Sequence, residues 1–248
     1  MNKLMRPKIL LSVKKIDEIY KIINYADIID LKNPNDGPIG SWNKNEIKEV
    51  IDLYQKTFSI SATLGNLKTM AEVNNKVSIF DSLGLKYIKI GYFYDSIENL
   101  GKILEFLKKK DLSTNIVIVF FAEKQKVIEK LSDHLEIFHK YKFNHIMIDT
   151  FDKSSGNLFD KINLETLKKI LFESDRLKIN LGLAGKLKAK NFKQLFSLQP
   201  NIIGFRGAVC KTKDRNSKIC IKKVKILFQQ LNFEIKQAQA TAGACIDA

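Results

Sequence analysis

Eight short stretches of β-branched and other apolar residues recur along the chain, and they constrain its fold more than any other feature. They span residues 8–13, 26–33, 58–65, 87–93, 115–122, 145–151, 178–185 and 201–210. The stretch 116–121 reads Ile-Val-Ile-Val-Phe-Phe and is apolar throughout. Such stretches are typical of strands that are buried on both faces of a parallel sheet covered by helices.

Amphipathic helical patterns separate these predicted strands. Residues 45–55, for example, place Ile47, Val50, Ile51 and Tyr54 at the spacing of one helix face. The stretches 96–109 and 219–233 follow the same period. Repeated strand–helix alternation over 248 residues predicts an α/β protein that is a single (β/α)8 TIM barrel, a fold of ~250 residues. A doubly wound open sheet is the alternative, but the dinucleotide fingerprint G-x-G-x-x-G is absent.

No linker rich in Pro, Gly or Ser interrupts the alternation, so residues 1–235 are predicted to form one catalytic domain. Residues 236–248 change to mostly small side chains and are predicted to be a flexible C-terminal tail. An ordered cap or a subunit contact is the alternative for this segment.

The chain carries a formal net charge of +15, from 42 Lys and Arg against 27 Asp and Glu. A polyanion partner would explain this excess, but the lysines are scattered over helical segments as on an ordinary solvated surface. We therefore expect no nucleic-acid or membrane partner. Three cysteines without paired spacing favour a reducing compartment, and the apolar stretch near the N-terminus is too short for a signal peptide or a membrane span. The cytoplasm is the expected location.

Charged residues lie at the ends of three predicted strands. Asp30 and Lys32 are two residues apart and therefore share the interior side of their strand, Lys89 interrupts an apolar strand, and Asp149 is followed by Lys153. Each one alone could equally be part of a structural ion pair. Strand ends converge in a barrel, however, and a buried lysine is costly unless it is paired or functional. The five residues are therefore predicted to be catalytic.

Lysines crowded in a desolvated barrel mouth lower one another's pKa, because burial and like charge both disfavour the ammonium form. A neutral lysine amine can attack a carbonyl carbon and form a Schiff base, while a second lysine moves protons. These residues therefore indicate aldol-type chemistry on a small aldehyde or ketone.

The last two predicted strands end in glycines and cations, which indicates a phosphate site. The candidate residues are Gly185, Lys186, Arg206, Gly207 and Ala208. Ordinary tight turns would explain the glycines but not a cation beside each of them. His134, His139 and His145 lack the spacing of metal ligands, so we expect no metal and no cofactor.

An ordered set of motifs covers the chain up to its last predicted helix and resembles a known family. The motifs are Asp-Leu-Lys-Asn-Pro-Asn-Asp-Gly-Pro-Ile-Gly at 30–40, Ser-Ala-Thr-Leu-Gly at 61–65, Tyr-Ile-Lys-Ile-Gly at 87–91, Asp149-Thr150 with Lys153 and 158–160, Leu-Ala-Gly at 183–185, and Arg-Gly-Ala-Val-Cys-Lys at 206–211 with Asp214-Arg215-Asn216. Together they resemble the (5-formylfuran-3-yl)methyl phosphate synthase family, also called 4-(hydroxymethyl)-2-furancarboxaldehyde-phosphate synthase.

The resemblance implies a carbon–oxygen lyase acting on phosphates, which condenses two molecules of glyceraldehyde 3-phosphate and releases one phosphate and two waters. The product feeds the biosynthesis of methanofuran- and methylofuran-type C1 carriers. By motif position, Lys32 is expected to be the Schiff-base lysine and Lys89 the proton acceptor, with Asp30, Asp149 and Lys153 in support. A homo-oligomer is expected.

Two alternatives stay open. One is another class I Schiff-base aldolase that uses the same Lys32 on a small sugar phosphate. The other is a basic nucleic-acid-binding module, whose salt-dependent binding would survive Lys32→Ala.

Overall fold

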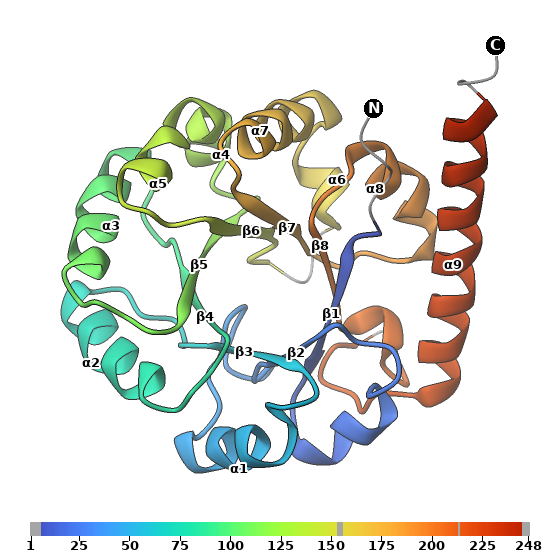
Figure 1. Ribbon diagram of the computed structural model, residues 1–248, viewed down its shortest axis with the longest axis horizontal. Helices are drawn as coiled ribbons and strands as arrows, with labels where there is room; N and C mark the ends of the chain where they lie inside the picture. The colour runs from blue at the N-terminus through green and yellow to red at the C-terminus, as the bar shows by residue number, and fades with distance from the viewer. Residues whose placement is uncertain (1–5, 153–155, 213, 245–248) are drawn as a thin grey trace.

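The computed structural model contains a closed barrel of eight parallel strands in chain order, with β1 paired to β8 (Figure 1). The structure describes residues 6–152, 156–212 and 214–244. The strands are β1 (Lys8–Val13), β2 (Ile28–Leu31), β3 (Ser59–Thr63), β4 (Tyr87–Gly91), β5 (Asn115–Phe121), β6 (His145–Asp149), β7 (Asn180–Leu183) and β8 (Ile202–Phe205). The predicted (β/α)8 barrel is confirmed, and the pairing of β1 with β8 excludes the open sheet.

Helices surround the barrel on its outer side (Figure 1). The α-helices are α1 (Lys44–Tyr54), α2 (Met70–Asp81), α3 (Leu100–Lys108), α4 (Gln125–Leu131), α5 (Glu136–Lys140), α6 (Leu158–Lys161), α7 (Leu164–Arg176), α8 (Phe192–Leu198) and α9 (Ile221–Ala244). The 3-10 helices are η1 (Ile16–Lys21), η2 (Ile97–Asn99), η3 (Ser132–His134), η4 (Ala189–Asn191) and η5 (Gly207–Val209). The connection between β1 and β2 is thus a short 3-10 helix, whereas the other connections contain an α-helix.

The helix α2 illustrates how local sequence sets the element boundaries. Thr69 precedes the helix, and its hydroxyl accepts a hydrogen bond from the backbone N–H of Glu72. The Glu72 carboxylate in turn accepts from the Thr69 backbone, which completes a capping box. Val73, Val77 and Phe80 form the buried face of the helix. The capping box therefore sets where the helix starts, and the spacing of the apolar residues sets which side packs on the barrel.

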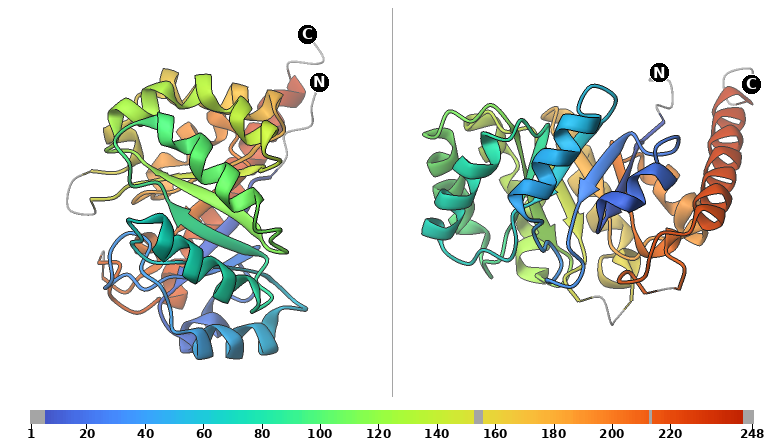
Figure 2. Two further views of the ribbon diagram at one scale, coloured as in Figure 1. Left: turned by 90° about the vertical axis from the view of Figure 1, so that its left-hand side faces the viewer. Right: turned by 90° about the horizontal axis from the view of Figure 1, so that it is seen from below.

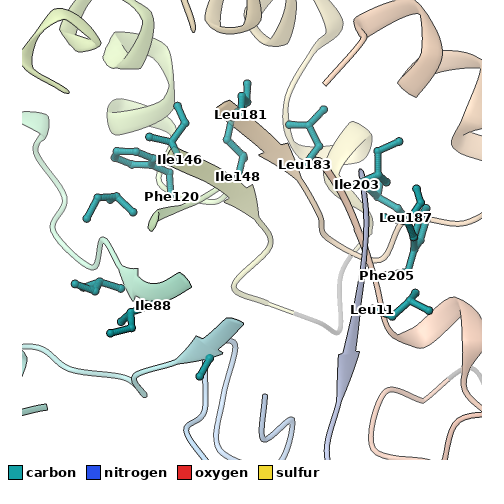
Figure 3. Close-up of a cluster of buried hydrophobic side chains, with 14 of the residues drawn as sticks. Leu11, Ile88, Phe120, Ile146, Ile148, Leu181, Leu183, Leu187, Ile203 and Phe205 are labelled. Atoms are coloured by element: carbon teal, nitrogen blue, oxygen red, sulfur yellow. The ribbon is translucent and has the colours of Figure 1, made fainter. Parts of the chain in front are cut away.

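The larger hydrophobic core lies between the strands and the helices. Outward-facing strand residues such as Ile88, Phe120 and Ile148 are fully buried there, and Figure 3 shows this layer. Burying one such side chain contributes about 1.5–3 kcal/mol relative to leaving it exposed. This layer accounts for the apolar residues on the outward faces of the strands.

A smaller apolar cluster fills the interior of the barrel and includes Leu10, Ile28 and Tyr87. Two residues further along their strands, Asp30 follows Ile28 and Lys89 follows Tyr87. Because side chains on one face of a strand recur every second residue, the interior changes from apolar to polar towards the carboxyl ends of the strands. That end of the barrel is where active sites lie in this fold.

The helix α9 runs to Ala244, so it passes the boundary predicted at residue 235. Figure 2 shows the start of β1 and the C-terminal end of α9 at one end of the barrel, and the chain that follows β8 at the other end. Within the described residues, no helix combines the length and the apolar character needed to cross a membrane.

Candidate active site

A buried ion pair between β4 and β2 lies at the centre of the site. Lys89 Nζ is 2.6 Å from Asp30 Oδ1, and both side chains are almost completely buried. Two hydroxyl groups complete the shell of Asp30, because Ser12 Oγ donates to Oδ2 at 2.7 Å and Ser61 Oγ donates to Oδ1 at 2.5 Å. The register explains the contact, since Ser12, Asp30 and Ser61 stand side by side on β1, β2 and β3.

Burial and charge set the ionisation of this pair. Burial lowers the pKa of Lys89, and the nearby charge of Lys32 lowers it further. The carboxylate of Asp30 raises the pKa of Lys89, but the net shift is downward. Burial alone would raise the pKa of Asp30, but the charges of Lys89 and Lys32 and the hydrogen bonds from Lys89 and Ser61 hold it below its ordinary value. The pair therefore combines an ionised carboxylate with an amine that loses its proton more easily than a surface lysine does.

A second lysine–carboxylate pair lies beside the first. Lys32, which directly follows β2, places its Nζ 3.0 Å from Asp149 Oδ2 at the end of β6. The backbone N–H of Thr150 donates to Asp149 Oδ1 at 2.8 Å and fixes the other oxygen. The Lys32 side chain keeps 12% of its surface exposed, against 4% for Lys89. Of these two lysines, Lys32 is therefore the more accessible to a solute.

Four of the five predicted catalytic residues thus converge: Asp30, Lys32, Lys89 and Asp149. The fifth, Lys153, lies outside the described residues. The chain leading to it is held by Glu123, whose carboxylate accepts from the backbone N–H groups of Phe151 and Asp152 at 2.7 and 3.0 Å.

The predicted phosphate residues that follow β7 are placed differently from one another. Gly185 has a φ of +108°, and an added Cβ would lie 2.7 Å from Thr150 Cγ2, so only glycine fits here without strain. This close approach places the end of β7 against the end of β6, next to Asp149. Lys186, the next residue, is exposed.

Arg206, which follows β8, is engaged within the protein. Its guanidinium pairs with Glu18 of η1 at 3.0 Å and donates to the backbone carbonyls of Ser12, Arg215 and Ser217. This differs from the expectation that its side chain binds a phosphate, because a buried carboxylate from η1 and three carbonyls already occupy its donors. Arg206 instead ties β1, η1 and the loop after η5 together.

Gly207 and Ala208 begin η5 directly after Arg206. The first N–H groups of such a turn have no partner within it, so they remain available to an anion. Both residues are partly exposed. The Arg206 side chain, by contrast, is buried.

Ser12 and Ser61 are site residues that the sequence reasoning did not select. Strand alternation could have identified Ser12, because it follows the interior Leu10 by two residues. Ser61 could have been identified from its place in the motif at 61–65. Within the described part of the chain, no group of three or more His, Cys, Asp or Glu residues could hold a metal ion.

A (β/α)8 barrel with two adjoining lysine–carboxylate pairs at the carboxyl ends of its strands has the architecture of a barrel enzyme. The family model of 4-HFC-P synthase matches residues 9–227. The chain belongs to this family.

Curated relatives agree with this assignment, and solved structures agree with the fold. (5-Formylfuran-3-yl)methyl phosphate synthase of Methanobrevibacter smithii is 30% identical over 206 residues, which cover 77% of this chain and 84% of that protein. The enzyme of the same name from Methanococcus aeolicus is 29% identical over 222 residues, which cover 84% and 92%. Phosphoribosyl anthranilate isomerase from Thermus thermophilus has a TM-score of 0.63 at 13% identity, covering 91% of this chain and 98% of that chain. This last likeness concerns the fold alone.

Proposed function

We propose that this chain condenses two molecules of glyceraldehyde 3-phosphate to (5-formylfuran-3-yl)methyl phosphate through a Schiff base on Lys32. Two trioses lose one phosphate and two waters in this reaction, which makes it a carbon–oxygen lyase reaction. The product would supply the furan of methanofuran-type C1 carriers. The observation that carries the proposal is the pair of adjoining lysine–carboxylate contacts, one partly exposed and one almost completely buried.

Accessibility supports Lys32 as the nucleophile. Its amine attacks the aldehyde carbon, and loss of one water leaves an iminium whose adjacent carbon is acidified. Asp149, 3.0 Å from Lys32 Nζ, can accept the proton that the amine gives up and then stabilise the positive iminium. The water lost in iminium formation returns when the product is hydrolysed from the lysine.

Burial supports Lys89 as the proton acceptor. A base must be deprotonated to act, and burial lowers the pKa of Lys89. Removal of the proton next to the iminium gives an enamine, whose carbon can then attack the aldehyde of the second triose. Asp30 stays ionised beneath Lys89 and stabilises the ammonium that forms when Lys89 takes up the proton.

Product analysis tests the proposal. The purified protein, incubated with glyceraldehyde 3-phosphate, is expected to release one inorganic phosphate for each conjugated aldehyde formed. The aldehyde is followed by its ultraviolet absorbance and identified by mass spectrometry. Lys48→Ala is the matched control, since Lys48 is an exposed lysine on α1 in a surface pair and should leave turnover unchanged.

Other outcomes are equally informative. A sugar phosphate formed without release of inorganic phosphate would replace the proposal by another class I aldolase reaction. Absence of any product from triose phosphates, in protein that is folded by circular dichroism, would overturn the substrate assignment.

A further inference from the structure

The loop between η5 and α9 carries Arg215, whose backbone is firmly held. Its carbonyl accepts from Arg206 Nε at 2.7 Å, and Arg206 is itself anchored by Glu18. The following N–H, that of Asn216, donates to Asp214 Oδ1 at 2.9 Å. The buried Arg206–Glu18 pair therefore fixes the position from which the Arg215 side chain extends.

The guanidinium of Arg215 has an unsatisfied donor. Its Nη1 is buried and has no hydrogen-bond partner, which makes Arg215 the one charged side chain among the described residues with a buried, unpartnered nitrogen or oxygen. Arginine donors that are hidden from water almost always have an acceptor. An anionic ligand would supply the missing acceptor.

Arg206 places the loop that carries Arg215 at the same end of the barrel as the two lysine–carboxylate pairs. Its guanidinium donates to the carbonyls of both Arg215 and Ser12, and the Ser12 hydroxyl in turn donates to Asp30. Burial lowers the pKa of Arg215, but the charge of Asp149 acts in the opposite direction, and Asp149 is the carboxylate paired with Lys32. Of the two cations that were expected to bind phosphate, Arg206 is engaged by Glu18, and Lys186 is exposed. The chain between η5 and α9 thus brings a guanidinium with an unpartnered nitrogen to the end of the barrel that holds Lys32.

We propose that Arg215 binds the phosphate group of the substrate held on Lys32, with its Nη1 donating to a phosphate oxygen. Arginine suits this role because its planar fork matches phosphate oxygens and its charge is permanent. The substrate class that follows is a short hydroxyaldehyde carrying a phosphate ester. The inference rests on the proposed function in one respect, namely that Lys32 is the covalent centre.

The test compares a phosphorylated and an unphosphorylated aldehyde. Borohydride trapping on Lys32 is measured with limiting glyceraldehyde 3-phosphate and with glyceraldehyde, in the wild type, in Arg215→Gln and in Arg215→Lys. For the phosphate ester, Arg215→Gln is expected to trap about 10- to 100-fold less than the wild type, as for the loss of a charge-assisted hydrogen bond. Arg215→Lys should recover part of this loss, and trapping of glyceraldehyde should not change. Arg176→Gln, on the exposed side of α7, is the matched control.

Equal losses for both aldehydes would assign Arg215 a structural role and overturn the inference, as would unchanged trapping of the phosphate ester. Binding of inorganic phosphate, measured by calorimetry, tests the phosphate site independently of Lys32. If no aldehyde is trapped on Lys32 in the wild type but Arg215→Gln still weakens phosphate binding, the covalent mechanism fails while the phosphate site stands. If Arg215→Gln leaves phosphate binding unchanged, the phosphate site fails.

Discussion

Lys32→Ala is expected to lower kcat/KM for glyceraldehyde 3-phosphate by at least about 10⁴-fold, because removal of a covalent nucleophile abolishes the chemical route and leaves only binding effects. Initial rates of product formation and phosphate release measure the loss. A variant that retains more than about a tenth of wild-type kcat/KM would contradict the account.

Lys32→Arg separates the nucleophile from the charge. It keeps a cation beside Asp149, 3.0 Å from the present Nζ, but a guanidinium does not form an imine under these conditions. Lys32→Arg is therefore expected to fold as the wild type does and to be as inactive as Lys32→Ala. Activity in Lys32→Arg would mean that charge alone matters at this position.

Lys89→Met is expected to impair both stability and activity. The substitution leaves Asp30 buried at the barrel centre without its closest cation, and breaking a buried pair in this way costs about 3–5 kcal/mol of the free energy of unfolding. Loss of the proton acceptor should reduce kcat by roughly 10²- to 10⁴-fold. Denaturant unfolding and steady-state kinetics measure the two effects.

The stability loss should depend on pH. In the wild type the pKa of Asp30 lies below its ordinary value of 3.8, so its contribution to stability is present above that value and is lost only as the pH falls through the lowered pKa. Without Lys89, burial is expected to raise the pKa of Asp30, so the folded variant binds a proton that the unfolded chain does not bind. The stability of Lys89→Met relative to the wild type should therefore fall as the pH rises from about 5 to about 7.

The double variant Lys89→Met with Asp30→Asn is the control for the stability effect. It removes both charges and keeps a side chain that can hydrogen-bond to Ser12 and Ser61. Much of the lost stability should return, since an uncharged replacement of a buried pair is often neutral, while activity should remain low. A stability deficit that is independent of pH and is not relieved by Asp30→Asn would show that Lys89 acts through packing alone.

The barrel could be predicted from sequence because its determinants are local. Residues 116–121 are apolar on both faces, and β5 occupies residues 115–121. Likewise, Asp30 and Lys32 are two residues apart, and strand alternation alone assigns them to one side. The predicted domain boundary at 235 relied on a change to small residues, but such residues are compatible with a helix, and α9 continues to Ala244.

The placement of Arg206 could not be predicted in the same way. Its partner Glu18 is 188 residues away in sequence and looks like an ordinary polar residue of an amphipathic stretch. Only closure of the barrel, which pairs β1 with β8, brings the two together. The Arg206 guanidinium also donates to the Arg215 carbonyl, so the position of the Arg215 loop depends on the same closure.

Trapping of the covalent intermediate tests the central claim most directly. The protein is incubated with glyceraldehyde 3-phosphate and borohydride, digested, and examined by peptide mass spectrometry. The account predicts a reduced triose phosphate adduct on Lys32 and none on Lys89, which is the more deeply buried of the two lysines. An unmodified Lys32 in protein that still turns over the substrate would contradict it.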